Sequence, residues 1–238
     1  TGYLPMLSGY KRTLLDKLFR RPGTPIYDWG YVTGTRRVVL DTYDGGFYGS
    51  NAFREQHAKM FEGKLHKGET VYYEVVGFTD DGTPIMASCD NKKVGDKDFV
   101  KQYGKQTVFS YGCSPDSVDA PKSALYVYRM TMTNEDGDVV EYSPFFMRYR
   151  CEQMGVNCVP LLWSGFVPEN DNPGEWVKGV AECYYDGADP IGKSHVREGV
   201  VCRIVNRPKF TAYKHKNFAF KVLEGIVKEV ASAPDMEE

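Results

Sequence analysis

The sequence predicts an α+β fold built on antiparallel sheets. Aromatic residues make up 14% of the 238 residues, and together with 24 glycines they favour strands joined by tight turns. Short alternating segments are separated by turn signals such as Asn-Glu-Asp-Gly at residues 134–137, which is typical of hairpins. Neither repeats nor an interdomain linker are evident. We therefore expect one domain over residues 1–230, followed by an acidic tail over residues 231–238.

Helix and strand signals alternate through the first sixty residues. Leucines and a phenylalanine recur at helical spacing over residues 11–21, which predicts a short amphipathic helix ended by the following Pro-Gly. Residues 31–41 are predicted as a strand and residues 44–46 as a turn. A second helix is expected over residues 50–61, with Ser50 as its N-cap.

The next segment contains a strand and a region without a clear pattern. Residues 69–78 are rich in valine and tyrosine, which predicts a strand, and the Asp-Asp-Gly-Thr-Pro run at residues 80–84 predicts the turn that ends it. Residues 89–106 are polar and rich in lysine. We expect them to form a long loop.

A hairpin and a helix are predicted in the middle of the chain. Residues 124–133 and 138–142 are expected to pair as strands around the turn at 134–137. A helix then begins at Ser143, which is followed by proline at the first helical position, and it ends at Gly155.

The last third is predicted to contain one helix and two basic strands. After a strand or loop at residues 156–163, a helix is expected over residues 176–185. Residues 199–206 and 212–222 are predicted as strands. Between residues 193 and 221 the chain holds eight Lys or Arg and one acid, although the net charge of the chain is -2. This segregation predicts a positive face suited to a nucleotide or a nucleic-acid backbone.

Composition also indicates what the chain is not expected to contain. It has no apolar run long enough to span a membrane and no signal-like start, so we expect a cytoplasmic protein without a membrane partner. The six cysteines form no Cys-x-x-Cys pair, and only four histidines are present. A structural zinc site is therefore not expected.

Two short motifs in the basic segment predict a phosphate and metal site. Lys214 and Lys216 are two residues apart on a predicted strand, so both ammonium groups should project from the same face. Two convergent positive charges suit a phosphate. Glu198 stands at the start of the preceding strand, where its carboxylate could hold a divalent ion that bridges to phosphate oxygens.

The order Glu198-Gly199 followed by Lys214-x-Lys216 resembles the last two motifs of the lysine-dependent nucleotidyltransferases, which include ATP-dependent RNA and DNA ligases and mRNA capping enzymes. Glu74, within residues 71–78, stands in a setting similar to the third motif of RNA ligases. The resemblance implies that its carboxylate contacts the nucleotide ribose.

Two further segments fit the same order of motifs. Residues 124–129 are similar to the strand that supplies an aromatic ring stacked on adenine, which implies this role for Tyr126 or Tyr128. Gly34-Thr35-Arg36-Arg37 resembles the motif that follows the nucleophile, which implies that Arg36 faces the nucleotide or the RNA 5′-phosphate.

As a set, the motifs resemble ATP-dependent RNA ligases of the second bacteriophage type, which implies an adenylation domain acting in RNA repair. The implied cofactors are ATP, bound as AMP, and Mg²⁺, and the implied partners are RNA ends. Such enzymes join a 5′-phosphate to a 3′-hydroxyl through lysyl-AMP and RNA-adenylate intermediates. The resemblance gives Lys214 and Lys216 the role of offsetting phosphate charge, and it makes Glu198 the Mg²⁺ ligand.

The nucleophile motif of this family, Lys-x-Asp/His-Gly, does not occur in the sequence. In the family it precedes the arginine motif, so we expect the chain to begin shortly after it and to lack the N-terminal part of the domain. Three alternatives stay open: a nucleotide- or RNA-binding module without catalysis, a DNA ligase or capping enzyme, and a β-rich structural or partner-binding domain. The RNA substrate and the oligomeric state are also left open.

Overall fold

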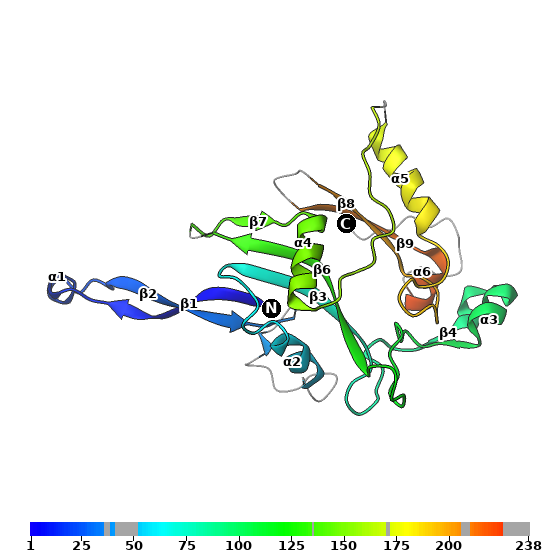
Figure 1. Cartoon of the computed structure of the whole chain (residues 1–238), viewed down its shortest axis with the longest axis horizontal. Helices are drawn as coiled ribbons and strands as arrows, with labels where there is room; N and C mark the ends of the chain where they lie inside the picture. The colour runs from blue at the N-terminus through cyan, green and yellow to red at the C-terminus, as the bar shows by residue number, and fades with distance from the viewer. Residues whose placement is uncertain (36–38, 41–51, 135, 170–171, 206–209, 226–238) are drawn as a thin grey trace. The chain divides into compact units, whose positions relative to one another are not determined.

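The computed structural model describes residues 1–35, 39–40, 52–134, 136–169, 172–205 and 210–225. The fold is mixed α and β with antiparallel sheets, as the sequence predicts (Figure 1). Contacts divide the chain into two compact units, each made of two segments. The first unit comprises Thr1–Glu74 and Val127–Cys158, and the second comprises Val75–Tyr126 and Val159–Glu238. Among the described residues, no helix is long and apolar enough to cross a membrane.

The elements follow one another along the chain without repetition. In the first third of the chain they are β1 (Gly2–Lys11), α1 (Leu14–Leu18), β2 (Thr24–Val32), α2 (Ala52–Lys59) and β3 (Glu69–Gly77). The middle contains β4 (Cys89–Asp90), the 3-10 helix η3 (Asn91–Val94), α3 (Lys97–Tyr103), β5 (Gln106–Thr107), β6 (Ser123–Thr133), β7 (Val139–Glu141) and α4 (Pro144–Met154). The last part contains α5 (Pro173–Tyr184), β8 (Gly199–Ile204), β9 (Thr211–Lys216) and α6 (Phe218–Glu224).

The largest sheet has the strand order β2-β1-β3-β6-β7. Its first hairpin, β1–β2, differs from the sequence prediction. β1 was not predicted, and the expected helix at residues 11–21 is reduced to the five residues of α1. β2 overlaps the strand expected at residues 31–41 only at residues 31 and 32, and residues 36–38 and 41 of that expected strand lie outside the described residues. The hairpin is held by the pairing of β1 with β2, a contact between distant residues that local patterns do not encode. The turn expected at residues 44–46 and the cap Ser50 lie outside the described residues.

The β6–β7 hairpin and α4 are confirmed as predicted. The turn between the two strands is closed by hydrogen bonds between Asn134 and Asp138. Ser143 caps the first turn of α4 by accepting from the amide of Phe146 at 3.2 Å, and Gly155 ends the helix in a left-handed conformation. These local signals are self-contained, which explains why the sequence predicts them correctly.

A buried ion pair holds α4 against the start of β3. Arg150 donates from Nε and Nη2 to the two carboxylate oxygens of Glu69, at 2.9 and 2.7 Å. The Tyr142 hydroxyl donates to the same carboxylate at 2.9 Å, and the His66 amide donates at 2.7 Å. Glu69 is fully buried, so this network satisfies a charge that would otherwise be strongly destabilising in the interior.

The loop expected at residues 89–106 is instead an ordered segment, and this prediction was wrong. It contains β4, η3, α3 and β5, and β4 pairs with β5. Asp90 caps η3 and Asp96 caps α3 through side-chain oxygens that accept backbone amides. Phe99 points from α3 into a core that also contains Phe109, Val196, Phe220 and Leu223. The lysines of this segment lie on its outside, which made its sequence look like a loop.

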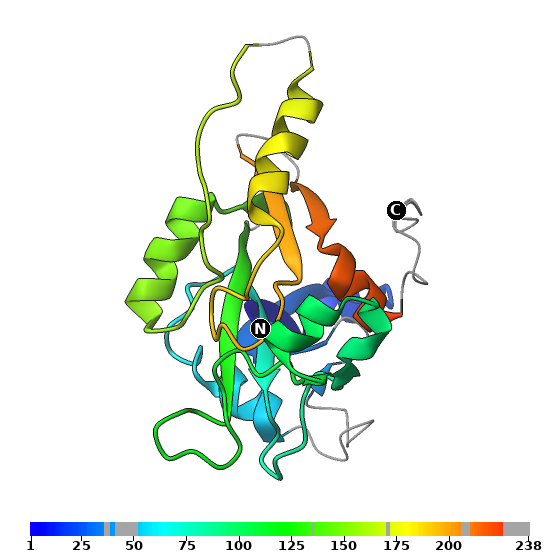
Figure 2. The same cartoon turned by 90° about the vertical axis from the view of Figure 1, so that its right-hand side faces the viewer.

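The end of the chain also departs from the prediction. The strand expected at residues 212–222 ends at Lys216, and α6 begins two residues later. Asn217 causes the change, because its side chain accepts from the Phe220 amide and so caps the new helix. Figure 2 shows α5 alongside β8 within the second unit. The tail predicted at residues 231–238 lies outside the described residues.

Candidate phosphate-binding ribbon

The two basic strands form a separate antiparallel ribbon, as the sequence predicts. In its register Lys216 lies opposite Gly199, and Lys214 lies opposite Val201. Directly opposed residues share a face, so both lysines, Gly199 and Val201 lie on one face of the ribbon. Arg203 belongs to the same face. The ribbon therefore presents a row of basic side chains on a single face.

The other face of the ribbon is partly covered by the protein, although Tyr213 on this face is exposed. His215 lies opposite Val200 on this face, and its ring meets the ring of Tyr185 edge-on, with the centroids 4.8 Å apart. Tyr185 directly follows α5, which lies along β8. This packing fixes which face of the ribbon is covered and leaves the lysine face turned away from α5.

Gly199 allows the ribbon to begin where it does. Its φ of 142° lies in a region that residues with a side chain rarely adopt. A Cβ at this position would lie 2.1 Å from the carbonyl oxygen of His215 and 2.7 Å from the Cα of Lys216. Both are backbone atoms of β9, so they cannot move aside without opening the pairing that presents Lys216. The glycine after Glu198 is therefore required by the geometry of the ribbon.

The two lysines have different surroundings. The ammonium group of Lys216 lies 2.9 Å from a carboxylate oxygen of Glu224 on α6, and the two side chains are 15% and 25% exposed. Lys214 is exposed. The positive charge available to a ligand on this face thus comes chiefly from Lys214, while that of Lys216 is partly offset by Glu224. This partner was not expected from the sequence, because residues 218–222 of α6 were predicted as strand.

Replacing Glu224 with glutamine is expected to strengthen anion binding at the ribbon. The substitution keeps the size of the side chain but removes the charge that competes with phosphate for Lys216. A solvent-accessible ion pair is worth about 0.2–1 kcal/mol, so the Kd for inorganic phosphate should fall by about 1.4- to fivefold. Isothermal calorimetry measures this change. Glu182→Gln is the matched control, since it breaks the Lys178 pair on α5, and an unchanged Kd in Glu224→Gln would contradict the expectation.

Glu198, the predicted metal ligand, directly precedes β8. Its backbone carbonyl accepts a hydrogen bond from the Asn217 amide at 2.8 Å, which extends the ribbon by one pair. The carboxylate is exposed. Within the part of the chain that the structure describes, no group of three His, Cys, Asp or Glu side chains could hold a metal ion. A single exposed carboxylate fits a Mg²⁺ ion that is also held by substrate phosphates and water, and does not form an all-protein site.

The predicted ribose contact, Glu74, lies on β3 in the first unit. Its side chain is exposed, so the strand does not bury this charge. The buried acid of this strand is Glu69, which the sequence analysis missed. Two residues before Glu74, and therefore on the same face of β3, Tyr72 meets the ring of Tyr128, with the centroids 6.5 Å apart.

The two candidate stacking residues differ in exposure. Tyr128 is 41% exposed, whereas Tyr126 is partly buried against a cluster that contains Phe78 and Cys113. Burial raises the pKa of the Tyr126 hydroxyl. Tyr128 has more of its ring surface available to a ligand, although both lie on the same face of β6. Arg36, the remaining predicted contact, lies outside the described residues.

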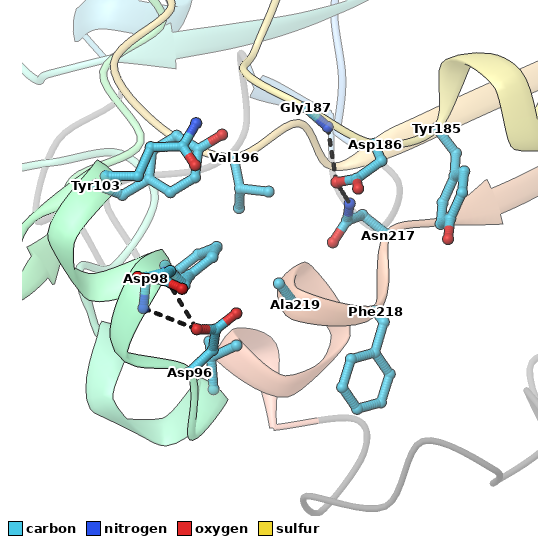
Figure 3. A pocket seen from close by; sticks show the side chains of 13 residues that line it. Asp96, Asp98, Tyr103, Tyr185, Asp186, Gly187, Val196, Asn217, Phe218 and Ala219 are labelled. Carbon is cyan, nitrogen blue, oxygen red and sulfur yellow. Dashed lines mark hydrogen bonds between the residues drawn. The ribbon is translucent and has the colours of Figure 1, made fainter.

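A pocket of about 420 Å³ lies in the second unit, close to the end of the ribbon (Figure 3). Asn217, which follows Lys216, donates from its amide to Asp186 at 2.7 Å on one wall. Asp96 and Asp98 from the start of α3 contribute to the opposite wall. The lining contains three aspartates and no Lys or Arg, so this pocket is unsuited to phosphate. The predicted phosphate contacts therefore point to the face of the ribbon rather than to this pocket.

Comparison with known proteins does not assign the chain to a family. No family model matches the chain, and no curated protein matches it. We therefore define the candidate site by the ribbon itself. Lys214, Lys216 and Arg203 form its basic face. Glu198 directly precedes the ribbon, and the close approach of β9 requires glycine at position 199.

Proposed function

We propose that the chain takes part in ATP-dependent joining of RNA ends, as an adenylation domain of the RNA ligase type. The observation that carries the proposal is the register of β8 and β9. It puts Lys214 and Lys216 on one face of the ribbon, with Lys216 opposite Gly199, the residue that follows Glu198. Motif order alone did not require these segments to be neighbours. A site that holds a phosphate next to a metal-binding carboxylate requires these two segments to be paired.

The chemistry of the sealing step assigns a role to each residue on this face. The oxygen of an RNA 3′-hydroxyl attacks the 5′-phosphorus of an adenylylated RNA, a new phosphodiester bond forms, and the bond to AMP breaks. The hydroxyl proton leaves to solvent, and AMP carries away the electron pair of the broken bond. Lys214 would stabilise the negative charge that develops on the phosphate oxygens, with Lys216 and its partner Glu224 behind it. Glu198 would hold a Mg²⁺ ion, which supplies further charge stabilisation when bound.

Sealing of pre-adenylylated RNA in the absence of ATP tests the proposal. This step uses no lysine nucleophile, so the 238-residue chain can be assayed directly with Mg²⁺, an adenylylated 5′-end and a 3′-hydroxyl acceptor. We expect ligated product, and we expect Lys214→Ala to reduce the rate by about 10²- to 10³-fold. Lys178→Ala, which removes an exposed lysine from α5, is the control and should leave the rate unchanged.

The same assay separates the alternatives. Sealing of adenylylated DNA in preference to RNA would favour the hypothesis that the chain belongs to a DNA ligase. If no sealing occurs but ATP or AMP raises the Tm, the chain is a nucleotide-binding module. If neither nucleotide nor RNA changes the Tm, the basic face is a solvated surface and the proposal fails.

A further inference from the structure

The β1–β2 hairpin extends beyond the sheet that it belongs to. β1 pairs with β2 as far as Lys11 and Thr24, whereas its described pairing with β3 is confined to Gly2. Most of the hairpin is therefore a two-stranded ribbon with α1 at its end, visible as the blue arm in Figure 1. An isolated two-stranded ribbon is marginally stable in water.

The end of the arm is apolar and exposed. We define residues 11–21 as the arm tip. Its four large apolar residues are between 63% and 87% exposed: Leu14, Leu15, Leu18 and Phe19. Tyr10 and Tyr27, on the strands behind the tip, are each more than half exposed as well. A contiguous apolar patch of this kind on a protein surface indicates a contact with another macromolecule.

The arm tip is also strongly basic. It contains five Lys or Arg residues and one acid, Asp16, a formal charge of +4 in a chain whose net charge is -2. Asp16 is engaged within the tip, because it accepts from the Thr13 amide at 2.9 Å and from the Thr13 hydroxyl at 2.6 Å. The surface that covers the tip must therefore be both apolar and acidic. RNA would satisfy the charge but would leave the leucines in water.

The chain itself carries an apolar and acidic surface. Residues 136–149 contain three acids and one arginine, Arg148. Glu141 is paired with Arg129 of β6, so the exposed Asp136 and Asp138 supply most of the negative charge of this surface. The exposed apolar residues here lie on β7 and the first half of α4: Val139, Val140, Phe145, Phe146 and Tyr149. β7 is the last strand of the sheet, so one of its backbone edges has no neighbouring strand among the described residues. We refer to residues 136–149 as the acidic edge.

The arm tip and the acidic edge belong to opposite sides of one sheet. In the order β2-β1-β3-β6-β7, the arm continues from the first two strands, and the acidic edge begins at the last. Three strand intervals, about 14 Å across, separate β1 from β7, and the arm leads away from the sheet. We propose that the arm tip of one copy docks on the acidic edge of a second copy, in a dimer that uses this contact twice.

Self-association of the chain tests the docking proposal. Sedimentation velocity in the ~100 µM range should show a dimer that weakens as salt is raised. Leu14→Asp combined with Leu18→Asp should raise the dimer dissociation constant at least tenfold, and so should Val140→Lys combined with Phe145→Lys. All four positions are exposed, so circular dichroism should show unchanged secondary structure. Val118→Asp, at a fully exposed valine in the second unit, is the control and should leave the dimer intact.

Mixing the two double variants identifies the contact itself. Each variant keeps one intact surface, so neither should dimerise alone, whereas the mixture should form a one-to-one complex. A monomeric wild type in the same concentration range would overturn the proposal. So would a wild-type dimer that survives the arm-tip changes, or arm-tip changes that weaken binding to RNA or to anionic lipid vesicles without altering self-association.

Discussion

Gly199→Ala is expected to open the β8–β9 ribbon and, with it, to abolish the sealing activity that we propose for the chain. The new Cβ would lie 2.1 Å from the His215 carbonyl oxygen, on a backbone whose φ of 142° already disfavours a side chain. Strain and lost pairing together should lower the free energy of unfolding by about 3 kcal/mol or more. Urea denaturation followed by circular dichroism measures the change in stability, and the sealing assay measures the change in activity.

Gly179→Ala provides the matched control for this prediction. Gly179 lies in α5 of the same unit, and a Cβ there meets nothing within 4 Å. Alanine should therefore raise stability by about 0.5–1 kcal/mol, because glycine is unfavourable in a helix. If Gly199→Ala behaves like Gly179→Ala, the close approach of Gly199 to β9 has no energetic importance, and its place after Glu198 needs another explanation.

Glu69→Ala is expected to be among the most destabilising substitutions in the first unit. It leaves the buried guanidinium of Arg150 without its carboxylate, and loss of one partner of a buried pair costs about 3–5 kcal/mol. Thermal unfolding measures the loss. Glu62→Ala, at an exposed position of the same segment, should change stability by less than about 0.5 kcal/mol.

A double substitution distinguishes the cost of an unmatched buried charge from the cost of altered side-chain packing. Glu69→Leu combined with Arg150→Leu removes both charges, so it should be less destabilising than Glu69→Ala alone. If it is equally or more destabilising, shape complementarity around the pair, rather than the unmatched charge, determines the cost.

The same network predicts how stability depends on pH. Burial by itself raises the pKa of Glu69, but hydrogen bonds from Arg150, the His66 amide and Tyr142 outweigh this effect, so the pKa lies below its usual value of 4.5. The stabilisation is complete above about pH 4.5, and it is lost as the pH falls through the lower folded-state pKa. The Tm difference between wild type and Glu69→Gln should therefore shrink on acidification below this value. A constant difference would show that Glu69 does not titrate with unfolding.

Several elements were predictable because their signals are local. Ser143 and Gly155 delimit α4 through their own backbone and side-chain geometry. The Lys214-x-Lys216 spacing sets the common face of the two lysines as soon as residues 211–216 form a strand. In each case the interactions that determine the local structure join residues close in the sequence, so the local sequence is sufficient to predict it.

Other features could have been read from the sequence but were obscured by composition. The segment at residues 89–106 contains capping aspartates at Asp90 and Asp96, and Phe99 and Tyr103 at helical spacing. Its exposed lysines suggested a loop. Asn217 before Phe-Ala-Phe was likewise a cap signal for α6, outweighed by the strand pattern of the residues preceding it.

The sequence by itself determined the α+β class, the β6–β7 hairpin, the bounds of α4 and the common face of Lys214 and Lys216. Only the tertiary structure decided that β1 and β2 form an arm, that Glu69 rather than Glu74 is the buried acid of β3, and that Lys216 pairs with Glu224. The physical reason is the range of the interactions. Caps, turns and strand alternation act between near neighbours, whereas strand pairing, burial and ion pairs depend on which distant residues the folded chain brings together.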